Sequence, residues 1–267
     1  MPNLNSNETT AKVEVDCISS GADHLQRQTR EVVKETPLTI EIQDVGTYTL
    51  MCTPVAQMEL AVGFAFTEGL IRKKDDINML LRCPDDPRVI RMQITDPSKA
   101  GDKKRSLLII SSCGICGSED IDKVIHHLPQ SDDRLRISRQ DLTAMTDSLK
   151  QRQDIFQRTG GTHAIALVKK GEIVALGEDV GRHNAFDKAV GSCILNQIPT
   201  SGSSAVLSGR VSFEMVAKAA RAGVELIAAV SAPTTLALDT ARHCHITLCG
   251  FVRGDQATIY CHSQRIL

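Results

Sequence analysis

The first half of the chain contains short runs in which apolar and polar residues alternate, as they do in strands that bury one face. Residues 38–43 and 47–52 alternate in this way on either side of Asp44-Val-Gly46, which predicts a β-hairpin. Residues 88–95 and 106–110 predict further strands.

Two helices are predicted in the same half. The first covers 55–68, with Thr53 as its N-cap, Pro54 in its first turn and Gly69 after its end. Ser138-Arg-Gln-Asp141 resembles a capping box and begins a second, long helix that is expected to end at residues 160–161. The apolar face of this second helix consists of Leu142, Met145, Leu149 and Phe156.

After residue 160 the pattern changes, and strand-like runs alternate with helix-like runs. Strands are expected at 163–169, 173–177, 204–208, 225–230, 246–251 and 257–261. Helices are expected at 182–195, 212–222 and 233–243. Strands that alternate with helices through short links predict right-handed crossovers and a mostly parallel sheet covered on both faces.

These patterns divide the chain into three parts. Residues 1–27 are polar and aperiodic, and a disordered tail is expected there. Residues 28–150 are expected to form a smaller α+β N-terminal domain, which ends with a loop that carries two cysteines and the helices after it. Residues 151–267 are expected to form an α/β domain.

The composition is that of an ordinary soluble globular protein, with 42% hydrophobic and 24% charged residues. Only 3% of the residues are aromatic and the net charge is −1, which argues against a surface that stacks on bases or attracts nucleic acid. No run reaches the roughly 20 apolar residues that span a bilayer, and the N-terminus lacks a signal pattern. A cytoplasmic protein with no nucleic-acid or membrane partner is therefore expected, and its nine cysteines are expected to be reduced.

Cys113 and Cys116 lie three positions apart in Cys113-Gly-Ile-Cys-Gly117, between a strand-like run and a helix expected from Ser118. A glycine after each cysteine leaves the thiols uncrowded. Three chemistries fit this spacing: a structural zinc site, a redox dithiol, and a nucleophile that transfers sulfur.

Each of the three chemistries has something against it. A structural zinc site usually needs a second ligand pair, and the chain has no second CxxC. A thioredoxin-like dithiol usually lies near the start of a small βαβ domain, whereas this one lies mid-chain. A helix N-terminus would lower the pKa of Cys116 and favour a nucleophile, but Glu119 and Asp120 oppose that effect. The spacing alone does not choose among them.

Three loops that follow predicted strands each carry an arginine. They are Glu178-Asp-Val-Gly-Arg-His-Asn184, Ser208-Gly-Arg210 and Gly250-Phe-Val-Arg-Gly-Asp-Gln256. Ligands of α/β folds bind at strand ends, so Arg182, Arg210 and Arg253 together predict an anion site, with His183 beside it. A capped helix start and a plain hairpin turn remain alternative interpretations of the first and third loops.

A fourth segment, Thr159-Gly-Gly-Thr-His163, is either a loop that cradles phosphate or a helix C-cap. Neither a GxGxxG fingerprint nor a P-loop occurs in the chain. The common dinucleotide-binding and NTP-binding folds are therefore not supported.

Together these segments resemble the formate dehydrogenase accessory sulfurtransferases, the FdhD family. The resemblance covers the chain from about residue 30 to its end. It rests on Cys52-Thr-Pro54, Ala61-Val-Gly-Phe-Ala-Phe-Thr-Glu-Gly69, Ser112-Cys-Gly-Ile-Cys-Gly117, Thr159-Gly-Gly-Thr-His163, Glu178-Asp-Val-Gly-Arg-His-Asn-Ala-Phe-Asp-Lys188, Ser208-Gly-Arg-Val-Ser-Phe-Glu214 and Gly250-Phe-Val-Arg-Gly-Asp255.

The resemblance implies a sulfurtransferase that takes persulfide sulfur from a cysteine desulfurase. The sulfur would pass to the molybdenum (or tungsten) bis(molybdopterin guanine dinucleotide) cofactor, a bound substrate that formate dehydrogenase then receives. Cys113 is the expected persulfide carrier and Cys116 its partner in transfer. The family's cofactor-binding stretch matches Phe251, Val252, Arg253, Gly254, Asp255 and Gln256. A cofactor chaperone without sulfur transfer and a zinc-stabilised regulator are the competing hypotheses.

The resemblance also implies a fold and an assembly. The C-terminal half is expected to be a three-layer domain like that of cytidine deaminases, and the protein is expected to form a homodimer. A zinc deaminase needs an HxE motif and a PCxxC motif. This chain has no HxE, and Ser112 stands where the proline would be. Neither deaminase chemistry nor a metal site is therefore expected.

Overall fold

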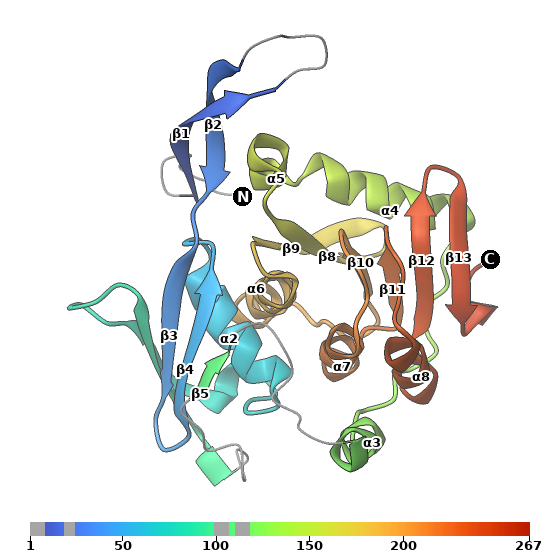
Figure 1. The fold of residues 1–267 in the computed structure, drawn as a ribbon. Coiled ribbons are helices and arrows are strands. Elements are labelled where there is room, and N and C mark those ends of the chain that lie inside the picture. The colour runs from blue at the N-terminus through green and yellow to red at the C-terminus, as the bar shows by residue number, and fades with distance from the viewer. Residues whose placement is uncertain (1–8, 19–24, 99–106, 110–117) are drawn as a thin grey trace.

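The computed structural model of the protein describes residues 9–18, 25–98, 107–109 and 118–267. These residues form three β-sheets with helices packed on the two larger ones (Figure 1). Within these ranges, no helix combines the length and the apolar character that a membrane span requires.

The first sheet is a two-stranded arm, β1 (Thr10–Cys17) and β2 (Gln26–Val33), which projects from the rest of the molecule (Figure 1). The strands are antiparallel over their full length. This arm differs from the disordered tail expected over residues 1–27. Its polar residues pair across the strands, because Arg27 lies 3.8 Å from Glu14 and 3.9 Å from Asp16.

The second sheet has five strands in the order β5-β6-β3-β4-β7. Its strands are β3 (Thr36–Ile42), β4 (Gly46–Cys52), β5 (Ile77–Arg82), β6 (Val89–Ile94) and β7 (Leu107–Ile109), and the 3-10 helix η1 (Lys74–Asp76) precedes β5. The predicted hairpin is confirmed, since β3 and β4 pair antiparallel around Asp44, which has a φ of 60°. The strands predicted at 88–95 and 106–110 are also confirmed.

Helix α2 (Gln57–Thr67) covers this sheet, but it begins differently from the prediction. Its N-cap residue is Ala56, in the left-handed conformation and without a side-chain cap. The predicted cap, Thr53, instead donates its hydroxyl to Asp179 at 2.9 Å, so a long-range contact replaces the local one. The predicted stop at Gly69 is confirmed, since this residue has a φ of 77° just after the helix.

The third sheet has six strands in the order β13-β12-β11-β10-β8-β9. The strands are β8 (His163–Lys169), β9 (Glu172–Asp179), β10 (Ser204–Leu207), β11 (Leu226–Ala229), β12 (Thr247–Arg253) and β13 (Gln256–Cys261), followed by the 3-10 helix η3 (Ser263–Arg265). Only the β10–β11 and β11–β12 pairs are parallel among its five pairings. The mostly parallel sheet that the sequence predicts is therefore wrong, because three of the five pairings are antiparallel: the hairpins β8–β9 and β12–β13, and the β10–β8 pair.

Helices cover both faces of the six-stranded sheet, as predicted. One face packs against α6 (Arg182–Leu195), α7 (Phe213–Arg221) and α8 (Thr235–His243). The other face packs against α4 (Arg139–Gln151). Helix α3 (Ser118–His126), which the sequence places after the cysteine motif, lies beside α8.

The helix start predicted at Ser138 is confirmed, since the Ser138 hydroxyl accepts from the Asp141 N–H at 3.0 Å. The Asp141 carboxylate accepts from the Ser138 hydroxyl at 2.8 Å, so Ser138 is an N-cap and the described contacts do not include the second bond of a capping box. The single long helix predicted after it is wrong, because a second helix, α5 (Asp154–Thr159), has its own start. The Glu178 carboxylate accepts the N–H groups of Ile155 and Phe156 at 3.1 and 2.7 Å, which fixes that start. Phe156 is consequently 44% exposed rather than buried on the face of α4.

The two larger sheets are joined through α2 and α6. The two helices approach so closely at Gly63 and Gly191 that no side chain fits between their backbones there. A Cβ atom on Gly191 would lie 1.8 Å from the carbonyl oxygen of Glu59, and one on Gly63 would lie 1.8 Å from that of Asp187. Only glycine fits at both positions. This close contact positions everything that α6 carries relative to the first half of the chain.

Candidate functional site

One edge of the six-stranded sheet gathers the polar loops that the sequence singles out. Strands β10, β11 and β12 run parallel, so their carboxyl ends share this edge. Strand β8 runs antiparallel to β10, so its first residue, His163, lies there too and pairs with Asp179 at the end of β9. The loops that carry Arg182, Arg210 and Arg253 therefore lie along the same edge.

Asp179 has a structural role in this region. It is fully buried, and one of its oxygens accepts from the Gly181 N–H and the Asn184 amide, both at 2.9 Å. The other oxygen lies 2.6 Å from Nζ of Lys188 and accepts from the Thr53 hydroxyl. Asp179 thus fixes the start of α6 to the end of β4, and it is not available to a ligand.

Arg182 and His183 each have a buried side-chain nitrogen that makes no hydrogen bond to the described residues. These atoms are Nε of Arg182 and Nε2 of His183, and the same holds for the hydroxyl of Ser212 before α7. A buried polar atom without a partner costs about 1–3 kcal/mol. Within the described ranges the one other such atom belongs to Glu225, which precedes β11 at the opposite edge of the sheet.

Positive charge accumulates around these atoms. Burial lowers the pKa of His163, and neighbouring positive groups lower it further. Those groups are Arg182, His183 and Arg210. A lowered pKa favours a neutral His163, which can donate or accept a hydrogen bond among cationic neighbours.

Two helices begin at the same edge without a side-chain cap. Gly181, which has no side chain to act as a cap, is the N-cap residue of α6. Ser212 is that of α7, and its hydroxyl does not bond to the helix. The N-terminal N–H groups and the helix dipoles favour an anion here.

Glu214 is the acidic residue of this region. Its carboxylate lies 3.8 Å from His183 Nε2, which is longer than a hydrogen bond. The interaction with His183 nevertheless lowers the pKa of Glu214 to about 2. We call His163, Arg182, His183, Arg210, Ser212 and Glu214 the basic edge.

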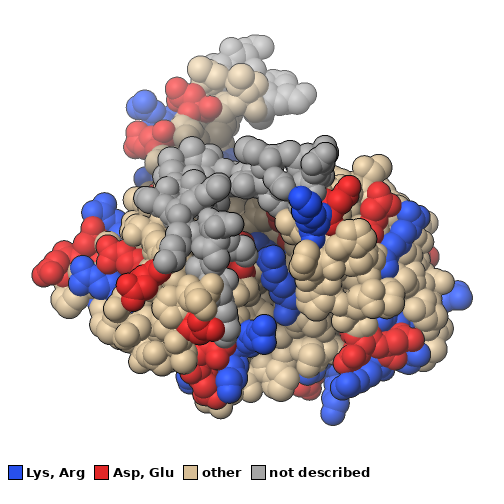
Figure 2. All heavy atoms as spheres, turned by 90° about the horizontal axis from the view of Figure 1, so that it is seen from below, with Lys and Arg blue, Asp and Glu red and all other residues tan. Residues whose placement is uncertain are grey.

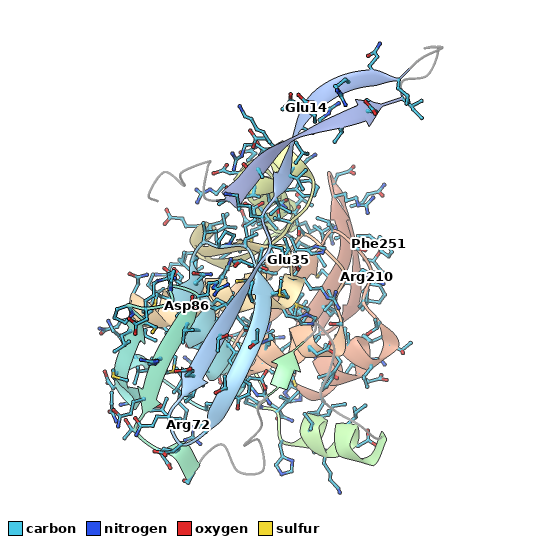
Figure 3. The ribbon with its side chains drawn as sticks, turned by 60° about the vertical axis from the view of Figure 1, so that its left-hand side comes forward. Glu14, Glu35, Arg72, Asp86, Arg210 and Phe251 are labelled. Atoms are coloured by element: carbon cyan, nitrogen blue, oxygen red, sulfur yellow. The ribbon has the colours of Figure 1, made fainter. Side chains whose placement is uncertain are left out.

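The predicted stretch at the end of β12 borders the basic edge. The Phe251 N–H donates to the carbonyl of Ser231 at 3.3 Å, and Arg253 Nε donates to the carbonyl of Val230 at 3.0 Å. The Val211 N–H reaches the same loop after β11, so Arg210 and Phe251 lie near one another (Figure 3).

The members of this stretch differ in what they offer a ligand. Phe251 and Arg253 are exposed, whereas Val252 is fully buried in the core and offers a ligand no side chain. Gly254 and Asp255 form the exposed turn that leads to Gln256.

Three residues of the basic edge, His163, Ser212 and Glu214, were not predicted as site residues. His163 was interpreted as part of a glycine-rich turn, and Gly160 does end α5 as a C-cap with a φ of 67°. His163 lies at the basic edge because β8 is antiparallel to β10. In a parallel sheet, the first residue of β8 would lie at the opposite edge. Ser212 and Glu214 follow Arg210 within four residues, so their closeness in sequence was the available signal.

Cys113 and Cys116 lie outside the described residues, so their position relative to the basic edge is not assigned. Among the residues that are described, no group of three His, Cys, Asp or Glu side chains could hold a metal ion. Seen from below, Lys and Arg side chains are interspersed with Asp and Glu (Figure 2). That face therefore carries no extended surface of one charge.

Comparison with known proteins connects this arrangement to a family. The family model described as FdhD/NarQ matches residues 33–267. The sulfur carrier protein FdhD of Bordetella parapertussis is 38% identical over 245 residues, which cover 90% of this chain and 88% of that protein. The protein of the same name from Sulfurisphaera tokodaii is 37% identical over 241 residues, which cover 88% and 91%.

A solved structure agrees with these sequence matches. A crystal structure from Desulfotalea psychrophila, named as that of a formate dehydrogenase accessory protein, superposes with a TM-score of 0.77 at 25% identity. The superposition covers 97% of this chain and all of that one. The sequence matches and the shared mixed α/β fold lead to one conclusion: this chain belongs to the FdhD/NarQ family.

Proposed function

We propose that this protein is a cytoplasmic sulfur carrier that supplies sulfur to the cofactor of formate dehydrogenase. Cys113 takes sulfur from the persulfide of a cysteine desulfurase, with Cys116 as its partner in transfer. The sulfur passes to the molybdenum (or tungsten) bis(molybdopterin guanine dinucleotide) cofactor, which the protein binds as a substrate. The names of its relatives, sulfur carrier protein and formate dehydrogenase accessory protein, support this function.

The first transfer step needs no external oxidant. The Cys113 thiolate attacks the outer sulfur of the desulfurase persulfide, the sulfur–sulfur bond of that persulfide breaks, and the desulfurase cysteine leaves as a thiolate. Cys113 then carries the persulfide. A persulfide is more acidic than a thiol, so it is largely ionised and nucleophilic at neutral pH.

The basic edge is the observation that carries the cofactor-binding part of the proposal. Three buried polar atoms without partners converge there with Arg210, His163 and two uncapped helix starts. Phosphate oxygens are acceptors that satisfy arginine and helix N–H donors with charge-assisted bonds. The dinucleotide phosphates would therefore bind to Arg182, His183 and Arg210, with Arg253 at the border.

Replacing Arg182 or Arg210 by alanine is expected to weaken the binding of guanosine diphosphate, used here as a probe of the phosphate contacts. Each substitution removes a charged hydrogen-bond donor, so the dissociation constant should rise about 10-fold or more. Isothermal titration calorimetry measures the change. Arg88→Ala is the matched control, because Arg88 pairs with Asp86 in the loop between β5 and β6 of the five-stranded sheet. Equal affinity in all variants would place the phosphates elsewhere.

Incubation of the protein with a cysteine desulfurase and cysteine is expected to add one sulfur to Cys113. Intact-mass and peptide mass spectrometry, after alkylation that preserves persulfides, would locate the added sulfur. A chain that gains no sulfur, yet still activates formate dehydrogenase, would favour the cofactor chaperone without sulfur transfer. About one zinc per chain in the purified protein would instead favour the zinc-stabilised regulator.

A further inference from the structure

A cleft of about 440 Å³ opens between the two halves of the chain, away from the basic edge. Its walls come from the end of α2, the turn that leads into η1, the loop between α6 and β10, and the end of α7. Helices α6 and α7 both begin at the basic edge and end at this cleft. The 14 residues of α6 span about 20 Å, so the two places are separate. Figure 3 accordingly shows Arg72, on the wall of the cleft, well away from Arg210.

The cleft is positively charged, although the chain as a whole has a net charge of −1. Its charged lining residues are Arg72, Lys73, Lys74, Arg221 and Asp75. Lys73 and Asp75 lie 3.5 Å apart and offset one another. Among the residues that the structure describes, no further carboxylate lines the cleft, so an excess of three positive charges remains there.

Two of these cations also have a structural role at helix ends. Lys74 donates to the carbonyl of Leu195 at 2.9 Å, and Arg221 donates to the carbonyl of Thr67. These carbonyls belong to the last residues of α6 and α2, where the helix dipole attracts cations. Helix ends do not account for Arg72, whose side chain is exposed and has no hydrogen-bond acceptor or carboxylate partner among the described residues.

Arg221 has donors left for a ligand. A guanidinium carries five N–H groups, and the Thr67 carbonyl accepts from only one nitrogen of this side chain. Arg221 also lines a second hollow of about 240 Å³ beside α3, so it is reachable from two sides. A half-buried arginine with free N–H groups is a typical contact for phosphate or carboxylate oxygens.

Apolar side chains form the wall next to these cations. Phe66, Ile194 and Ile198 are partly buried and line the cleft. Ligand pockets of about 300–1,000 Å³ commonly combine such an apolar lining with a few polar groups that orient the ligand. A bare inorganic ion would leave this wall uncovered, whereas an anion with an apolar body covers it. The cleft is therefore suited to an organic anion.

We propose that the cleft is a second anion site, which binds a small organic phosphate and is separate from the site of the guanine-dinucleotide cofactor. Phosphate groups carry about −1.5 to −2 charges each, so they suit an excess of three positive charges better than a single carboxylate does. They lie against Arg72 and Arg221, and the apolar body of the ligand lies on Phe66, Ile194 and Ile198. Such a ligand touches both halves of the chain, so its binding stabilises their arrangement.

Adenosine diphosphate is a suitable probe, because it carries two phosphates on a largely apolar body. The Arg182→Ala/Arg210→Ala double variant, whose basic edge lacks both arginines, is expected still to bind one adenosine diphosphate per chain by isothermal titration calorimetry. Adding Arg221→Lys keeps the charge but removes the planar set of donors, and it is expected to raise the dissociation constant about 10-fold or more. Absence of binding by the double variant, or equal affinity after Arg221→Lys, would overturn the proposal.

Arg72→Ala covers the case that Arg221→Lys disturbs the fold, because Arg72 is exposed. In the same double variant it is expected to raise the dissociation constant about 5-fold or more. Arg152→Ala, an exposed position at the end of α4, is the matched control and should change nothing. A cleft that binds a hexaglutamate peptide but not adenosine diphosphate would be a protein-docking surface, and the proposal would be wrong. Because Arg72 and Arg221 lie outside the basic edge, this result is independent of the guanosine diphosphate titrations.

Discussion

Formate dehydrogenase matured with the Cys113→Ala variant is expected to have activity no higher than enzyme matured without any carrier. The substitution removes the only sulfur of that side chain, so no persulfide can form at this position. Binding of guanosine diphosphate should be unchanged, because the basic edge belongs to other elements. Loss of activation together with intact nucleotide binding would separate sulfur transfer from cofactor binding.

The measurement is a maturation assay in cells that lack the native carrier, with the amount of soluble protein checked by immunoblot. Cys193→Ala is a suitable control, since Cys193 is a fully buried core thiol on α6 whose pKa burial raises to about 11. Such a thiol is protonated and enclosed, so it is not a sulfur acceptor. Activation that survives the loss of both Cys113 and Cys116 would support the chaperone hypothesis and end the persulfide proposal.

Gly191→Ala is expected to destabilise the whole chain by about 3 kcal/mol or more, because one methyl group has no room between α2 and α6. The atom that the new Cβ would meet is the backbone oxygen of Glu59, only 1.8 Å away. A backbone oxygen cannot rotate away as a flexible side chain can. The helices must therefore separate, and the packing between the two large sheets is lost.

Urea denaturation followed by circular dichroism measures this loss. The neighbouring Ser192→Ala substitution adds no atoms, and it is expected to change the free energy of unfolding by less than about 0.5 kcal/mol. If Gly191→Ala unfolds at the same urea concentration as the native chain, the close helix crossing contributes little to stability.

Local signals predicted the elements well. The helix predicted at 182–195 coincides with α6. The helical spacing of its apolar residues was enough to locate it. The N-cap at Ser138 is confirmed because its hydroxyl and the Asp141 N–H lie three residues apart. All six strands of the larger sheet were also predicted within a few residues.

Contacts between distant residues account for the errors. Thr53 looked like a helix cap, but its partner Asp179 lies 126 positions further on. The break between α4 and α5 depends on Glu178, which follows α5 by a whole strand. The direction of β8 depends on its pairing with β10, and periodicity carries no information about that pairing.

The candidate site was likewise predictable where local sequence signals define it and unpredictable where long-range contacts do. Arg182, His183 and Arg210 could be chosen from the sequence because they stand in loops after strands. Their grouping with His163 and Ser212 could not, since it requires the strand order and the two helix starts. Val252 was chosen from the matched motif, but its side chain is buried in the core, and the motif alone does not reveal this burial.

The contacts of Asp179 indicate that the second half of the chain cannot be expressed alone as a folded domain. Thr53 and Lys188 both lie against this carboxylate, so residues from the two halves of the chain share one buried charge cluster. A fragment from residue 151 onward would retain every strand of the six-stranded sheet. It would lack Thr53 and the whole of α2, so the glycine face of α6 would be bare and the start of α6 would lose its anchor. The two halves are therefore expected to fold only together, although their sheets are separate.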